Sequence, residues 1–524
     1  MFCLALTDMT LLADNKRLIL FFALILFIIA KTPHLDDPFY WDESWVYGPG
    51  VRTMYENGPS LLPDAIPVDL SRGHPLFFHF AASLWATLFG PSLFALHCFG
   101  LFVFVLLAVT VFEIMLALFS YRVAVISLLL LLCNLSFLTA SSLLLNDILL
   151  ALLTILSLYS YSKGQFVRTA IFLTLIVFTK ESGLVVCALV GIDLCYRTIY
   201  SREPRGTLIK RYITLAVPLL LTGLFFVIQK KMLGWYLYPG HTSAINLDIV
   251  NTFSLSRTIL SVFFYNERIY YFWLVPVVLS FVAAIKQKNL RYLSIPAFAI
   301  VMYLMLRFFN SKDAVYYAFV PLSLIGLAWL FLRRLSRYNP LQKRFILYAV
   351  AFVVAHTYFC AVNFYEMRYV FPALLLVSVV LLALLTDYLI DKTYNRMFVP
   401  VAALIPVLSL LNYSLGTDAF VMYDHLEVQQ HIVDYFEEHN LHSKKIWTYT
   451  YLHQSHLQDK KAGFLRNEKP FNNVSLDLNE QTEFLIVDNI EFGDQYLHIR
   501  TDSAFRQVYR YQKGGSWGEV YIRR

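Results

Sequence analysis

Residues 18–45 read LILFFALILFIIAKTPHLDDPFYWDESW, and this stretch decides the class of fold. It opens with an apolar run after Lys16 and Arg17 and closes on the adjacent acids Asp42 and Glu43, which stand among aromatic residues. The apolar run is similar to a signal-peptide core, but no small-x-small cleavage site follows it, so we predict a retained first span. Carboxylates beside a membrane are costly and usually have a function. The stretch therefore predicts chemistry immediately outside a membrane.

Composition places the chain among polytopic membrane proteins. Its 524 residues are 58% hydrophobic, 16% aromatic and only 15% charged, and the mean hydropathy is +0.57. The net charge of +7 does not predict a nucleic-acid partner, because the basic residues fall between apolar runs, where membrane topology accounts for them. The six cysteines show no CxxC or histidine-paired spacing, so we expect neither a disulfide framework nor a zinc site.

Apolar runs of roughly 16 to 25 residues predict about thirteen membrane-spanning helices. The fold class we expect is an all-α polytopic membrane protein with a small C-terminal α/β soluble domain on the outer face. The predicted spans lie near residues 18–31, 93–117, 123–142, 147–162, 169–180, 183–197, 212–229, 270–285, 293–307, 315–332, 345–361, 370–388 and 397–411.

The distribution of lysine and arginine orients these spans, since both residues collect in short cytoplasmic loops. Basic residues cluster around positions 16–17, 122, 163–168, 197–211, 286–291, 333–344 and 392–396. All these clusters fall on one side if the N-terminus is cytoplasmic. We therefore expect an integral protein of the bacterial inner membrane whose N-terminus is cytoplasmic and whose C-terminal segment is extracytoplasmic.

Two domains are predicted. Residues 1–411 form the transmembrane domain, whose first outward loop, 32–92, carries interfacial helices, one of them over Pro75–Gly90. Residues 412–524 lose the long apolar runs and gain charge, which is typical of a soluble α/β domain. There we expect a helix over 427–439, strands over 446–451 and 484–488, and a hairpin of 505–511 with 518–522 that turns at Lys513-Gly514-Gly515.

The unusual polar residues of the transmembrane domain all fall on the outward rim. Each has an ordinary structural explanation: Asp42 or Asp147 as a helix cap, Lys180 as a snorkelling cation or the partner of Glu181, and His74 as a loop residue. Their shared placement on one side favours a functional site instead. The rim residues are Asp42, Glu43, Asn146, Asp147, Lys180, Glu181, Lys312, Asp313 and the segment Glu366-Met367-Arg368-Tyr369.

The order of these motifs resembles that of the GT-C membrane glycosyltransferases, in the branch of protein O-mannosyltransferases and lipid A aminoarabinose transferases. The resemblance covers most of residues 18–411. It rests on the Asp-Glu pair in Tyr40-Trp41-Asp42-Glu43-Ser44, the run Gly73-His74-Pro75-Leu76, the acid in Asn146-Asp147, the pair Thr179-Lys180 and the late Arg368-Tyr369-Val370-Phe371-Pro372. The chain departs from the family in three respects: the second proline of the Pro-Pro run is missing, His74 replaces a frequent lysine, and Glu181 stands where glycine is common.

The resemblance implies inverting transfer of a sugar from a polyprenyl-phosphate donor to an acceptor hydroxyl on a protein, lipid or glycan. We assign Asp42 as the general base, Glu43 to orienting the loop or binding the acceptor, and Lys180 and Arg368 to stabilising the leaving lipid phosphate. The chain has no Walker A or Gly-rich dinucleotide fingerprint, as expected when the donor arrives through the membrane. We expect no metal or other cofactor to be required. The clustered acids leave open that a divalent cation binds there. Further substrate-binding candidates are Tyr369, His74, Asp147, Glu181, Arg307 and Lys312.

Two alternatives stay open at the level of sequence. A transporter or flippase of lipid-linked sugars would place its ionisable groups near the bilayer midplane in corresponding halves, whereas here the charges lie at the outer rim. An outer-face ligase or acyltransferase would lack the early Asp-Glu pair. The C-terminal domain could select the acceptor or simply cap the assembly.

Overall fold

The computed structural model describes residues 15–200, 204–243, 245–264, 270–289, 292, 338–363, 366–414, 418–489, 498–500 and 502–524. Within these ranges the chain is mostly helical, and six helices are long and apolar enough to cross a membrane. Six shorter apolar helices accompany them. The predicted spans 293–307 and 315–332, and with them Arg307 and Lys312, lie outside the described residues. The described residues form the fold that the sequence predicts, an all-α polytopic membrane part followed by a small C-terminal α/β domain.

The loop between the first two long helices, α2 and α6, is folded into short elements. Its helix α3 takes in Pro49 and stops at Gly58, whose φ of 97° is readily adopted by glycine. An apolar helix, α5, forms within the expected stretch 75–90. The elements are α2 (Asn15–Lys31), η1 (Thr32–His34), η2 (Glu43–Tyr47), α3 (Gly48–Asn57), α4 (Val68–Ser71) and α5 (Phe77–Phe89), where η denotes a 3-10 or π turn.

The next group of helices begins with those that form the buried centre of the molecule, α6, α7 and α9. Serine side chains cap two of them: Ser92 accepts from the Ala95 amide, and Ser120 accepts from the Val123 amide. Helix α9 is buried along nearly its whole length, between α6 and α10. The group comprises α6 (Leu93–Leu118), α7 (Tyr121–Cys133), α8 (Leu135–Ala140), α9 (Asn146–Ser162), α10 (Phe166–Thr179), η3 (Glu181–Gly183), α11 (Leu184–Tyr200) and α12 (Arg205–Leu233).

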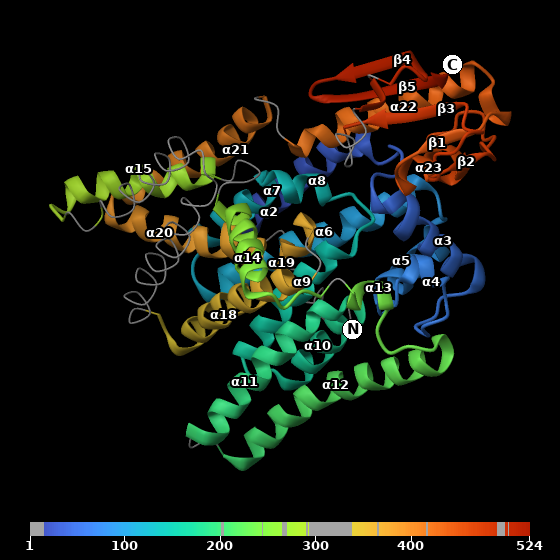
Figure 1. Ribbon diagram of the computed structural model, residues 1–524. Coiled ribbons are helices and arrows are strands. Elements are labelled where there is room, and N and C mark those ends of the chain that lie inside the picture. Colours follow the sequence, from blue (N-terminus) through green and yellow to red (C-terminus); the bar gives the residue numbers. More distant parts are fainter. Residues whose placement is uncertain are drawn as a thin grey trace.

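The later helices complete the transmembrane part. Helix α12 runs along one edge of it and exposes apolar side chains such as Leu220 and Val227, as a lipid-facing helix does (Figure 1). Helix α18 begins at Pro340 with a capping box formed by Asn339 and Gln342. These elements are α13 (Pro239–Thr242), α14 (Ile249–Phe264), α15 (Tyr270–Lys286), α18 (Pro340–Val362), η6 (Met367–Val370), α19 (Phe371–Leu374), η7 (Leu375–Leu381), α20 (Leu382–Lys392), η8 (Asn395–Met397) and α21 (Phe398–Ser414).

The C-terminal part is a small α/β domain that lies beside the first-loop elements α3, α4 and α5 (Figure 1). Its five-stranded sheet has the order β2-β1-β3-β5-β4. Strand β1 pairs in parallel with β2 and β3, whereas β5 pairs antiparallel with β3 and β4. Helix α22 packs on the β4/β5 hairpin. The elements are α22 (Asp418–Glu438), η9 (Leu441–Ser443), β1 (Ile446–Thr448), α23 (Tyr451–Gln458), η10 (Lys460–Ala462), β2 (Val474–Ser475), β3 (Phe484–Asp488), β4 (Phe505–Lys513) and β5 (Ser516–Arg523).

The sequence prediction for this domain is correct for the hairpin and for β3 and wrong for the end of the first strand. Strand β1 stops at Thr448 instead of continuing to Tyr451. The reason is local: the Thr450 side chain accepts a hydrogen bond from the Leu452 amide and so caps helix α23. This helix was not expected from the sequence.

Candidate active site

Asp42 lies in the turn that connects α2 to α3. The turn departs from regular structure, since Trp41 has a positive φ of 52° and residues 43–47 form a π turn. The Asp42 side chain makes no capping hydrogen bond; instead its Oδ2 accepts one from Nη2 of Arg368, and the two groups form an ion pair. Because Arg368 lies in η6, at the entrance to α19, this contact joins the first outward loop to the last part of the transmembrane helices.

Glu43 points away from Asp42 into the protein interior. It is fully buried, its Oε2 accepts from the Tyr40 amide at 3.0 Å, and its Oε1 accepts from the Leu144 amide. His97 Nε2 of helix α6 lies 3.3 Å from the same Oε1. The two acids diverge because the backbone is helical here and neighbouring side chains on a helix point in different directions.

Asp147 and Lys180 form the second half of the charged cluster. Asp147 lies in the first turn of α9 and is fully buried, and Lys180 follows the end of α10. Lys180 Nζ lies 3.4 Å from Asp147 Oδ1, and Arg368 Nη1 lies 3.7 Å from Asp147 Oδ2. The ammonium is also 3.5 Å from the centre of the Tyr369 ring. Two carboxylates and two cations therefore alternate in the order Asp42, Arg368, Asp147, Lys180.

Glu181 is not the partner of Lys180, contrary to one explanation that the sequence allowed. Lys180 has an extended backbone, with φ −163° and ψ 143°, so its side chain and that of the next residue project in different directions. Glu181 Oε2 instead lies 2.7 Å from His74 Nδ1. The ring of His241, from α13, lies 4.6 Å from the ring of His74. Burial, together with the charge of His74, lowers the pKa of His241 to about 4.

A small polar pocket opens at this cluster, between the first loop and the ends of α9, α10 and η6. Most of its lining is polar or aromatic, and it includes four of the residues predicted from the sequence: Asp42, His74, Arg368 and Tyr369. The other lining residues are Val46, Tyr47, Leu70, Ser71, Arg72, Pro75, His79, Asn146 and Thr179.

Sequence reasoning did not single out Arg72 and His79, and it named Asn146 only as the neighbour of Asp147. Arg72 directly precedes the Gly73-His74-Pro75 motif, which is the one signal that could have drawn attention to it, and its guanidinium lies 4.3 Å from the Trp45 ring. His79 is buried on α5, and neither ring nitrogen has a hydrogen-bond partner in the described part of the chain. An imidazole on an apolar helix gives no pattern that marks it as part of a pocket.

The arrangement of the helices, with a charged pocket at one end of them, is a GT-C-like fold, the fold that the sequence resemblance predicted. Solved structures of ArnT from Cupriavidus metallidurans are among those that share it. The crystal structure of ArnT bound to undecaprenyl phosphate matches 97% of this chain and 98% of its own, with 12% identity and a TM-score of 0.52. The apo state matches 95% of this chain and 97% of its own, with 11% identity and a TM-score of 0.50. No family model and no curated protein matches the sequence.

Proposed function

We propose that this protein is an inverting glycosyltransferase of the bacterial inner membrane. It moves a sugar from a polyprenyl-phosphate donor to an acceptor hydroxyl on the outer face. The fold shared with ArnT, whose crystal structure contains undecaprenyl phosphate, supports a donor of this class. The observation that carries the proposal is the alternation of Asp42, Arg368, Asp147 and Lys180 at the pocket.

The chemistry assigns one role to each kind of charge. The acceptor oxygen attacks the anomeric carbon of the donor while Asp42 takes the hydroxyl proton, and the bond from that carbon to the phosphate oxygen breaks. A positioned base of this kind accelerates a reaction by about 10²–10⁴-fold. The electron pair leaves with the polyprenyl phosphate, whose additional negative charge is stabilised by Arg368 and Lys180.

The hydrogen bonds of Arg368 leave one of its donors for the phosphate. Its Nη2 donates to Oδ2 of Asp42, and its buried Nη1 has no hydrogen-bond partner among the described residues. Guanidinium N–H groups form strong, charge-assisted hydrogen bonds with phosphate. Nη1 can therefore donate to the donor phosphate while Nη2 stays on Asp42, so the cation that stabilises the phosphate also holds the base in place.

The orientation follows from the placement of charge. Asp147 stands at the start of α9, Lys180 at the end of α10 and Arg368 before α19, so all three lie at one end of the helices. The basic clusters around positions 122, 197–211 and 392–396 belong to the opposite ends. The pocket and residues 412–524 are thereby extracytoplasmic and the N-terminus is cytoplasmic.

To test this proposal, membranes that contain the wild type or a variant are given radiolabelled polyprenyl-phosphate sugars. The amount of label transferred from the donor is then measured. We expect transfer by the wild type and a loss of at least about 10²-fold in Asp42→Asn, with donor binding retained. Asp36→Asn is the matched control, because Asp36 lies exposed in the same loop and undergoes the same chemical change. Full transfer by Asp42→Asn would remove Asp42 as the base. Label that crosses the bilayer with its phosphate bond intact would identify a flippase.

A further inference from the structure

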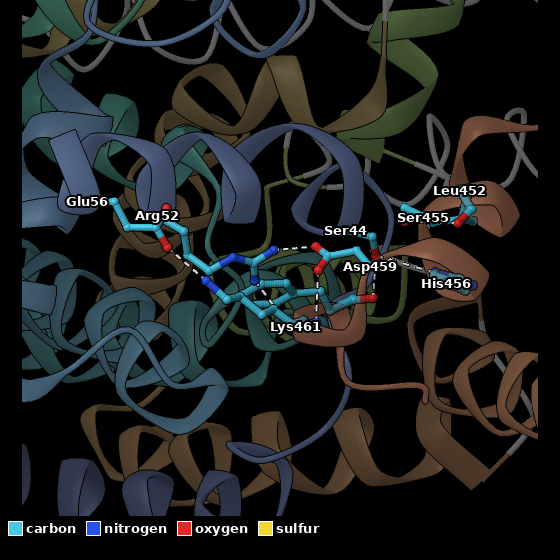
Figure 2. Close-up of polar contacts among 9 residues, drawn as sticks. Ser44, Arg52, Glu56, Leu452, Ser455, His456, Asp459 and Lys461 are labelled. Atoms are coloured by element: carbon cyan, nitrogen blue, oxygen red, sulfur yellow. Dashed lines mark hydrogen bonds and ion pairs between the residues drawn. The ribbon is translucent and has the colours of Figure 1, made fainter. Parts of the chain in front are cut away.

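The loop that carries Asp42 is held from outside the transmembrane part by one segment of the C-terminal domain. The segment consists of α23 and η10. It contacts the chain on both sides of Asp42, at Phe39 and Ser44, and the adjoining helix α3 (Figure 2). The loop is irregular around Trp41, and such backbone keeps a single conformation only where its surroundings impose it.

An ion pair between the buried Arg52 and the half-buried Asp459 anchors helix α3. Arg52, which is 5% exposed, pairs through Nη2 with Asp459, and its Nη1 donates to the Lys461 carbonyl at 3.0 Å (Figure 2). A second pair, between Lys461 and Glu56, joins the same two elements at 2.8 Å but is solvent-exposed. A buried, hydrogen-bonded pair is far more costly to break than an exposed one.

The backbone on either side of Asp42 is tied to the same segment. The Phe39 amide donates to the Ala462 carbonyl at 2.9 Å. Ser44 donates its hydroxyl proton to the Phe39 carbonyl at 2.6 Å, and its oxygen lies 3.4 Å from His456 Nε2 (Figure 2). Since the one hydroxyl proton of Ser44 is already used, His456 is the donor in this contact.

An aromatic contact extends from the same segment to the pocket. The rings of Trp45 and Tyr451 stack with centres 5.4 Å apart and planes at 12°. The guanidinium of Arg72, which lines the pocket, lies 4.3 Å from the Trp45 ring. A displacement of α23 would therefore move side chains that line the pocket as well as the backbone of the loop.

We infer that Asp459 and His456 are positioning residues for sugar transfer: the segment α23–η10 of the C-terminal domain sets the place of Asp42 relative to Arg368. The inference rests on the proposed function. It gives the C-terminal domain a part in turnover that is separate from binding the donor. The donor phosphate is bound by Arg368 and Lys180, and the ion pairs of these two cations run to Asp42 and Asp147. A displacement of about 1 Å in a catalytic group costs about 10²-fold in rate.

The test compares two cross-domain ion pairs in the full-length protein. Asp459→Asn removes the carboxylate that pairs with the buried Arg52, Asp459→Glu keeps its charge, and Lys461→Met removes the exposed pair as the matched control. We expect kcat, expressed per donor-binding site, to fall about 10- to 100-fold in Asp459→Asn while KM for the donor stays within about twofold. Asp459→Glu recovers most of kcat, and Lys461→Met retains the wild-type value.

A readout independent of activity separates this inference from the proposed function. Hydrogen exchange of the backbone over residues 39–47 should accelerate in Asp459→Asn and stay unchanged in Lys461→Met. If the wild type transfers no sugar, the proposed function fails, whatever the exchange shows. If the wild type transfers sugar and Asp459→Asn keeps full kcat, the positioning role fails and the proposed function stands.

A milder variant serves if Asp459→Asn does not fold. Tyr451→Ala removes a ring whose side chain is largely exposed and whose loss opens no buried cavity. We expect kcat to fall about two- to tenfold with an unchanged donor KM, in line with the energy of one aromatic pair. Wild-type kcat in Tyr451→Ala, together with unchanged exchange over residues 39–47, would overturn the inference.

Discussion

Arg368 donates a hydrogen bond to the carboxylate of Asp42 across 326 positions of sequence, and this ion pair places an acid of the loop after α2 against an arginine just before α19. Asp147 lies 3.7 Å from the same guanidinium, so the arginine lies between two carboxylates. An arginine held in this way is fixed in position before the donor arrives. Preorganisation of this kind is what makes a cation effective on a leaving phosphate.

Replacing Arg368 by glutamine removes this cation while keeping most of the side-chain length. We expect kcat/KM for the donor to fall about 10²–10³-fold, because the phosphate loses charge stabilisation in the transition state. Steady-state transfer assays measure this value. Arg122→Gln is the control, since Arg122 pairs with Asp387 and Asp391 away from the pocket. Equal losses in the two variants would show that the effect comes from ion-pair loss in general.

Glu43→Gln should destabilise the protein. Both carboxylate oxygens accept backbone amides, from Tyr40 and Leu144, so either orientation of a glutamine turns its NH₂ group toward an N–H donor. We expect a loss of about 3 kcal/mol, seen as a lower thermal midpoint in detergent. Glu113→Gln, which breaks the half-exposed pair with Arg17, should cost at most about 1 kcal/mol. A Glu43→Gln protein as stable as the wild type would contradict the role of Glu43 in holding the loop.

Gly73→Ala tests how closely the segment 235–242 packs against Gly73 and His74 beside the pocket. A Cβ at Gly73, where φ is 70°, would lie 2.6 Å from the Trp235 ring. We expect this segment to be displaced, with faster hydrogen exchange over residues 235–242 and weaker donor binding. Gly90→Ala has a similar φ of 87° but meets nothing within 4 Å, so it isolates the cost of the backbone conformation. The two variants behaving alike would exclude a clash as the cause.

The segment around His241 should loosen as the pH falls. In the closed segment the pKa of His241 is about 4, below the value of about 6.5 in the unfolded chain. Between pH 4 and pH 6.5 the opened segment therefore binds more protons than the closed one. The stabilisation is complete above pH 6.5 and is progressively lost as the pH falls toward 4. The charged groups facing the imidazole are His74, Glu181, Arg72 and Lys180. Hydrogen exchange over residues 235–242, corrected for intrinsic rates, should show this dependence in the wild type and a weaker one in His241→Asn.

Transfer should persist when divalent cations are removed with EDTA. Both carboxylates at the pocket already face Arg368 or Lys180, and these cations supply the charge that a metal would bring to the leaving phosphate. In the described part of the chain, no three histidine, cysteine or acidic residues are grouped as metal ligands would be. Transfer assays before and after chelation measure the effect. A loss restored by Mg²⁺ or Mn²⁺ would show that the site needs a metal.

Features set by local chemistry could be predicted from the sequence. The apolar run expected over 93–117 forms helix α6 (Leu93–Leu118), and the strand expected over 484–488 is β3. The length of an apolar run and the alternation of apolar and polar residues depend only on residues close together in the sequence. A long apolar run forms a membrane-spanning helix, and an alternating run forms a strand. The same reasoning placed Asp42, Asp147, Lys180 and Arg368 at the outward rim.

The choice of partners was decided only by the tertiary structure. Lys180 pairs with Asp147 and not with its neighbour Glu181, and Asp42 pairs with Arg368. Asp459 carries no pattern that connects it to the loop, and Arg72 is marked only by its place before Gly73-His74-Pro75; the neighbours of both come from other elements. A charged side chain pairs with whatever group lies within a few ångströms of it, and that distance depends on how helices far apart in the chain pack together.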